Sequence, residues 1–176
     1  MSDLSLLLQI HILAALAAIG LGAIVFSLPK GGTTHRRFAS AYVVAMLVTT
    51  GVVIFVPATV LEFGNSGWGF FHLFILVGGI SSAVGAFALW RWRVTRDPQW
   101  LRNHQVRFAF SYAGLLMAGL SQVLTNPRFG IVETMSLQAF WAVFAASNLA
   151  ILAVAMVIVQ RYLMKGDPRR RYALKP

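Results

Sequence analysis

Five long apolar stretches occupy most of the chain and decide what it can fold into. They run over residues 4–28, 38–61, 69–90, 108–125 and 136–160. Each approaches or exceeds the roughly 20 residues that a helix needs to cross the hydrocarbon core of a bilayer. Backbone polar groups in lipid must be satisfied within the segment, so these stretches predict helices. The expected fold class is therefore all-α integral membrane, with five transmembrane helices.

The composition supports a lipid bilayer as the surroundings of the chain. Hydrophobic residues make up 58% of it and charged residues only 11%, where soluble domains carry about a quarter charged residues. Asp3 is the only charged residue before the first stretch, so that stretch is expected to be a retained helix, not a signal peptide. The chain has no cysteine, which excludes disulfides, thiolate metal sites and cysteine nucleophiles.

The basic residues gather in three segments. All of the 15 except Arg128 lie within residues 30–37, 91–107 and 161–175. If the helices alternate in direction, these segments share one side of the membrane. The positive-inside rule then predicts a bacterial inner-membrane protein with its N-terminus outside and its C-terminus in the cytoplasm. A net charge of +10 placed in this way indicates anionic headgroups as partners, with no nucleic acid.

Two segments of the chain repeat one pattern. The stretch "THRRFASAYVVAM" begins at Thr34 and "HQVRFAFSYAGLLM" begins at His104. Aligned on Arg37 and Arg107, they match at Arg, Phe, Ala and Tyr, and each has a histidine just upstream. The domain prediction is one transmembrane domain over 1–165 with a basic cytoplasmic tail over 166–176. Within that domain, repeat halves at about 4–61 and 69–125 form a pseudo-twofold four-helix bundle, and an extra helix covers 136–162.

The four histidines fall into two pairs by expected depth. His11 and His72 lie towards the outer side in the first and third helices, and His35 and His104 lie at the cytoplasmic starts of the second and fourth. A b-type haem takes one axial imidazole from each of two helices. Ala18, Gly22, Gly79 and Ala83 lie at helical spacing beneath the outer histidines, where small residues would admit a macrocycle.

The histidine pattern therefore predicts two b-type haems with His11, His72, His35 and His104 as axial iron ligands. Basic residues at the membrane edge would neutralise the propionates. The candidates are Arg36, Arg37, Arg102 and Arg107 for the inner pair and Arg128 for the outer pair. Leu28 follows His11 by seventeen residues, or about 25 Å of helix, so haems at the two depths would span much of the bilayer. The expected function is electron transfer across or within the membrane.

Two resemblances bear on this reading. The segment "KGGTTHRRFASAYVVAM" and the later "HQVRFAFSYA" resemble the signature of a bacterial membrane family, domain of unknown function 2306, over roughly residues 8–125. That family name implies no activity. The architecture is also similar to di-haem transmembrane cytochromes b. This second resemblance implies that the four histidines are axial ligands and that electrons are exchanged with quinone or a redox protein.

Other readings stay open at this stage. A lone histidine at a membrane edge is more often an interfacial anchor, and Gly or Ala faces often pack helices together. The chain could then be a cofactor-free small transporter or a subunit of a membrane complex. Four imidazoles could also bind zinc or copper, but the split in depth leaves only two per site. The sequence leaves both enzyme activity, which would be that of a quinone-linked oxidoreductase, and homo-oligomerisation undecided.

Overall fold

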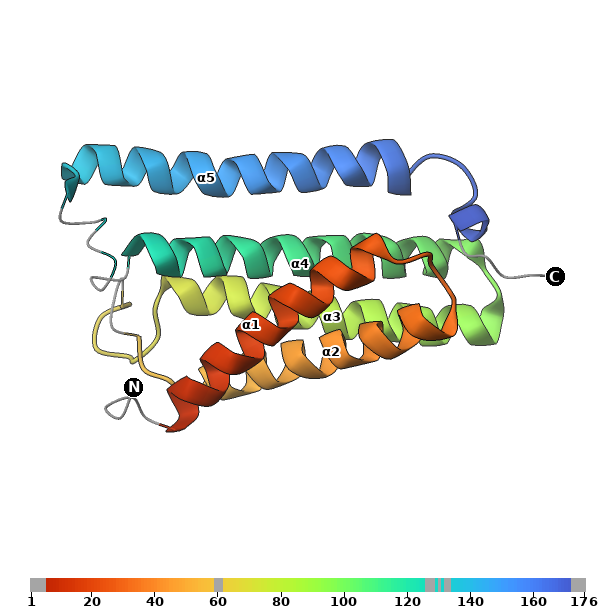
Figure 1. The fold of residues 1–176 in the computed structure, drawn as a ribbon, viewed down its shortest axis with the longest axis horizontal. Coiled ribbons are helices and arrows are strands. Elements are labelled where there is room, and N and C mark those ends of the chain that lie inside the picture. Colours follow the sequence, from red (N-terminus) through yellow and green to blue (C-terminus); the bar gives the residue numbers. More distant parts are fainter. Residues whose placement is uncertain (1–5, 59–61, 126–128, 130, 132–133, 172–176) are drawn as a thin grey trace.

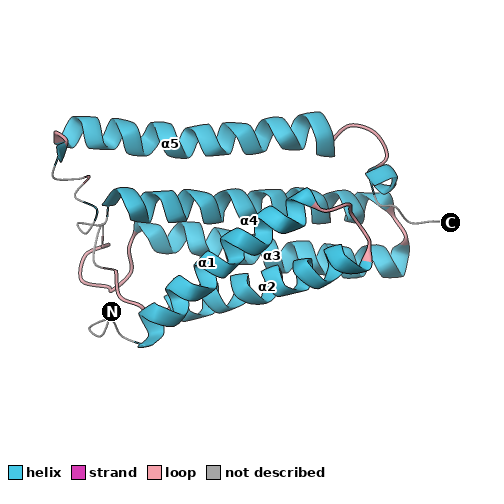
Figure 2. Ribbon diagram, viewed as in Figure 1, coloured by secondary structure: helices cyan, strands magenta, loops and turns pink. Residues whose placement is uncertain are grey.

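The computed structural model describes residues 6–58, 62–125, 129, 131 and 134–171. Their fold is helical, with five helices: α1 (Leu6–Ser27), α2 (Thr33–Val53), α3 (Phe70–Thr95), α4 (Pro98–Thr125) and α5 (Leu137–Ile158). A short π-helix (Val159–Leu163) continues α5, and a 3₁₀ turn (Pro168–Arg171) follows it. No β-strand forms among these residues (Figure 2), although Glu62 and Gly69 make one isolated bridge. All five helices are long and apolar enough to span a membrane.

The bounds of α2 and α4 differ from those of the apolar stretches. The second stretch was expected over 38–61, whereas α2 starts at Thr33 and ends at Val53, before Pro57. The fourth was expected over 108–125, whereas α4 starts at Pro98. Proline suits the first position of a helix, and the side chain of Asp97 accepts a hydrogen bond from Gln99 N at 2.9 Å. Helix geometry therefore continues beyond the apolar core into the polar interface.

The helices alternate in direction, so the chain has two distinct ends (Figure 1). The α1–α2 turn, the α3–α4 turn and the 3₁₀ turn lie together at one end, called here the basic end. The connections α2–α3 and α4–α5 lie at the other, called the opposite end. Of the described basic residues, those in 30–37, 91–107 and 161–171 belong to the segments that meet at the basic end. The direction of this axis across a membrane stays a prediction.

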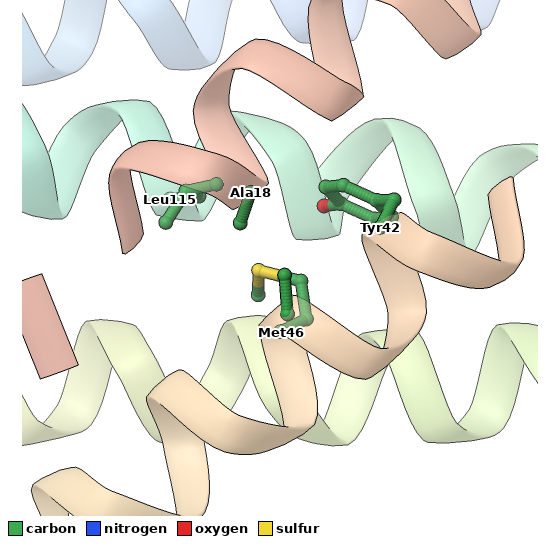
Figure 3. Packing of buried hydrophobic residues seen from close by; sticks show 5 residues of the cluster. Ala18, Tyr42, Met46 and Leu115 are labelled. Atoms are coloured by element: carbon green, nitrogen blue, oxygen red, sulfur yellow. The ribbon is translucent and has the colours of Figure 1, made fainter. Parts of the chain in front are cut away.

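The helices pack as two hairpins that meet along α2 and α3. α1 lies against α2 and α3 against α4, while α5 packs on the outside of α4. The main core cluster lies between α1, α2 and α4, with Ala18, Tyr42, Met46 and Leu115 at its centre (Figure 3). In α1 only Ala18 and Gly22 are buried, which fits a helix surrounded mostly by lipid. That the hairpins are copies of each other stays a prediction.

A hydrogen bond from Asn148 links α5 to α4. Its Nδ2 donates to Ser121 Oγ at 3.0 Å and to Phe144 O at 2.8 Å, and Ser121 is fully buried. Asn148→Ala should lower the free energy of unfolding by about 1 kcal/mol, as interhelical hydrogen bonds in membranes do. Ser147→Ala is the control, because Ser147 bonds only the carbonyl of Phe144 in its own helix. Equal thermal midpoints for the two purified variants would show that the bond adds no stability.

Candidate functional site: two histidine pairs

The four histidines lie in four different helices and pair at the two ends of the molecule. His11 of α1 interacts electrostatically with His72 of α3 at the opposite end. His104 of α4 interacts with His35 of α2 at the basic end. Each pair therefore has one member in the α1–α2 hairpin and one in the α3–α4 hairpin. These are the pairs that the sequence pattern predicts, although their role as ligands is not thereby tested.

The basic-end pair has ring nitrogens available for a ligand. His104 Nδ1 donates to Gly85 O at 2.9 Å, which leaves the lone pair of Nε2 free. His35 is buried, and its Nδ1 has no hydrogen-bond partner. Metal-ligating histidines commonly donate their second ring N–H to a backbone carbonyl. Both imidazoles therefore have the hydrogen-bonding state that an axial ligand requires.

The opposite-end pair fits a metal only in part. His11 Nδ1 donates to Thr49 O at 3.2 Å, so its Nε2 lone pair is free. His72 Nδ1 accepts from Gly69 N at 3.1 Å, and its Nε2 lies 2.9 Å from Val56 O. A carbonyl can only accept, so Nε2 carries the proton and both nitrogens are engaged. His72 caps the start of α3. To bind iron through Nε2 its proton would have to move to Nδ1, which would break the hydrogen bonds with both Val56 O and Gly69 N, whereas binding through Nδ1 would displace Gly69 N alone.

The arginines that were expected to pair with haem propionates do not lie together. Arg36 and Arg37 are exposed on the first turns of α2. Arg102 donates from Nη2 to Gly166 O at 2.9 Å, while its buried Nε has no partner. Arg107 lines a groove on the α5 side of α3 and α4. Arg128 lies outside the described residues.

Two other cations lie near the basic-end pair. Lys30 interacts electrostatically with His35, and Arg93 with His104. Lys30 Nζ donates to Val25 O and Phe26 O, both at 2.8 Å, beyond the last turn of α1. Partial burial lowers the pKa of its amine. The sequence pattern singles out neither residue, because Lys30 comes near His35 only through the α1–α2 turn. Arg93, in the last turn of α3, comes near His104 only through the packing of α3 on α4.

Three of the four small residues beneath the outer histidines, Ala18, Gly22 and Gly79, pack against neighbouring helices, whereas Ala83 is exposed. A Cβ added to Gly22 would meet the ring of Tyr112, and one added to Gly79 would meet the side chain of Thr50. Ala18 is fully buried among Tyr42, Met46 and Leu115 (Figure 3). The space that these small residues leave is therefore filled by side chains.

A hydrogen-bonded polar group lies between the middle parts of α2, α3 and α4. Tyr42 Oη and Ser111 Oγ are 3.0 Å apart, and Ser82 Oγ lies 2.6 Å from Ser111 Oγ. All three side chains are almost completely buried. Polar groups within membrane helices are costly unless they are paired, and here each is satisfied. The repeated tyrosines differ in partner, because Tyr112 Oη donates to Ile19 O at 3.2 Å instead.

Within the described residues, no group of three or more His, Cys, Asp or Glu side chains could hold a metal ion. This finding gives no support to a zinc or copper centre held by protein ligands alone. A haem iron, in contrast, needs only two axial imidazoles from the protein. No family model, no curated protein and no solved structure matches the chain.

Proposed function

We propose that this protein is a membrane cytochrome that holds b-type haem between histidines of its two hairpins and moves electrons across or within the bacterial inner membrane. The observation that carries the proposal is the basic-end pair. His35 and His104 come from different hairpins, interact with each other and each keep one ring nitrogen free. A bound haem would supply one-electron redox chemistry. Quinone is the proposed exchange partner, with a redox protein as the other candidate.

The protein's own residues would set up the basic-end site in three ways. The Gly85 carbonyl fixes the ring of His104 and its tautomer, which also makes the ring a stronger ligand. His35 offers a buried Nδ1 without a partner. Lys30 and Arg93 place positive charge beside the pair, which favours carboxylates there. The opposite-end site, with His11 and His72, is proposed as the second haem site and requires His72 to give up at least the hydrogen bond from Gly69 N.

Vesicles loaded with ferricyanide test the electron-transfer step. Each quinol added outside releases two electrons, and each ferricyanide inside accepts one. We expect the full-length protein to speed loss of the ferricyanide absorbance well above the rate of empty vesicles. His104→Gln should abolish the gain, because the amide can still donate to Gly85 O but is a poor iron ligand. A rate equal to that of empty vesicles, from haem-loaded protein, would argue against transfer across the membrane.

The proposed orientation has a direct test, because the natural chain has no cysteine. Ser66→Cys places a thiol in the connection at the opposite end, and Asp167→Cys places one after α5 at the basic end. With the N-terminus outside, an impermeant maleimide should label the first variant in intact cells. The second should react only after the membrane is permeabilised. The reverse pattern would invert the proposed orientation.

A second candidate function is a cofactor-free subunit or small transporter. The packing of Tyr112 on Gly22 and of Thr50 on Gly79 favours it, because the small residues then serve helix contact alone. In this case the histidines are helix caps and interhelical hydrogen bonds. Haem content separates the two candidates, since a cofactor-free subunit would purify colourless from cells well supplied with haem.

A further inference from the structure

An apolar groove of about 450 Å³ lies between α3, α4 and α5, and none of the four histidines lines it. It forms because α5 packs on α4 and leaves the neighbouring face of α3 uncovered (Figure 1). Val77 of α3 lines it and is 58% exposed, so the groove opens on the surface that faces lipid. Phe110, Met117 and Leu152 supply further apolar walls. The dimensions are those of a site for a small amphiphile.

Arg107 is the charged residue of this lining. Its side chain is exposed, and among the described residues the single ion pair joins Arg169 to Asp167, so no described carboxylate neutralises Arg107. Arg107 lies nine residues into α4, about 13 Å from the start of the helix. α4 has 28 residues, about 42 Å, against a hydrocarbon core of about 30 Å. The apolar part of α4 begins at residue 108, so the guanidinium is attached at the boundary between the hydrocarbon core and the polar interface, within reach of lipid phosphates.

We infer that this groove binds an anionic phospholipid, with the headgroup phosphate on Arg107 and an acyl chain along Val77, Phe110 and Met117. The charge is complementary, because a guanidinium pairs with phosphate through two parallel hydrogen bonds. Ser81, also in the lining, adds a hydroxyl near the polar part. Arg107 lies towards the basic end, where the surrounding cations favour anionic lipid over zwitterionic lipid. This site goes beyond the proposed electron transfer and does not depend on haem.

Native mass spectrometry of the full-length protein in detergent tests the inference. The probes are phosphatidylglycerol and phosphatidylcholine, added at equal concentration, and the readout is lipid retained per chain. We expect phosphatidylglycerol to be retained preferentially. Arg107→Gln should weaken its binding about ten-fold, as loss of a hydrogen bond between charged groups does. Arg161→Gln, an exposed arginine beyond α5, should leave binding unchanged.

A second pair of variants tests the groove itself without removing charge. Val77→Trp should fill the groove from its exposed side and reduce retention. Val84→Trp, at another exposed position of α3 outside the lining, should not. Equal retention of the two lipids would overturn the inference, as would unchanged binding by both Arg107→Gln and Val77→Trp. Preferential retention of decyl-ubiquinone, insensitive to Arg107→Gln, would assign the groove to a neutral quinone instead.

Discussion

Replacing His35 by alanine is expected to remove the haem of the basic-end site while the helices remain folded. His35 Nδ1 is buried without a partner, and such an atom costs about 1–3 kcal/mol when it stays unsatisfied. A purely structural role for His35 would not explain why this nitrogen is buried unsatisfied, whereas a role as an iron ligand would. Haem per chain should fall by one relative to the natural protein. Pyridine haemochrome analysis against protein concentration measures it.

Imidazole rescue separates ligation from folding. Free imidazole at millimolar concentration should enter the space left by His35→Ala and restore the lost visible bands. His35→Leu keeps an apolar side chain in that space and should not be rescued. In the absence of haem, the His35→Leu protein should be at least as stable as the natural chain, because the unsatisfied buried nitrogen is gone. Full haem content in both variants would show that His35 is not a ligand.

Substitution of Gly22 is expected to give the largest loss of stability. The ring of Tyr112 lies where a side chain at Gly22 would be. That ring has little freedom to move, because its hydroxyl bonds Ile19 O and its face meets Phe26 at a centroid distance of 5.2 Å. Gly22→Ala should therefore lower the free energy of unfolding by about 1–3 kcal/mol, the usual cost of overpacking. Unfolding of the purified protein in mixed detergent and denaturing detergent measures it.

Gly20 provides the matched control in the same helix. A Cβ at Gly20 meets nothing within 4 Å, and alanine is the better helix former by about 0.5–1 kcal/mol. Gly20→Ala should consequently be neutral or stabilising. If Gly22→Ala proved as stable as Gly20→Ala, the close contact between α1 and Tyr112 would be wrong. The space at Gly22, about 16 Å along α1 from His11, would then be open.

Much of the fold could be predicted from the sequence, because hydrophobic length alone decides whether a segment spans a bilayer. The five helices follow from the apolar stretches. The start of α4 could not be placed in that way, since residues 98–107 are polar and only Pro98 and the Asp97 cap mark a helix start there. The end of α2 before Pro57 was missed for a related reason, because Ile54–Val56 are apolar but lie outside the helix.

The candidate site was predictable in its pairing and not in its details. One histidine per helix at matching depth suffices to expect His11 near His72 and His35 near His104. The hydrogen bonds of a histidine depend on side chains and carbonyls that are distant in sequence. The bond from His72 to Val56 O could therefore not be predicted from the sequence. Lys30 and Arg93 were missed in the same way. Arg107, grouped with the inner pair by its position in the repeat, lines the groove beside α5.

The measurement that tests the central claim most directly is a reduced-minus-oxidised visible spectrum of the purified natural protein, with haem quantified per chain. The protein should be produced in cells well supplied with haem. We expect b-type bands and two haems per chain, one of which depends on His35 and His104. A spectrum without haem bands would contradict it. The paired histidines would then serve as helix caps and interhelical bonds in a cofactor-free membrane protein.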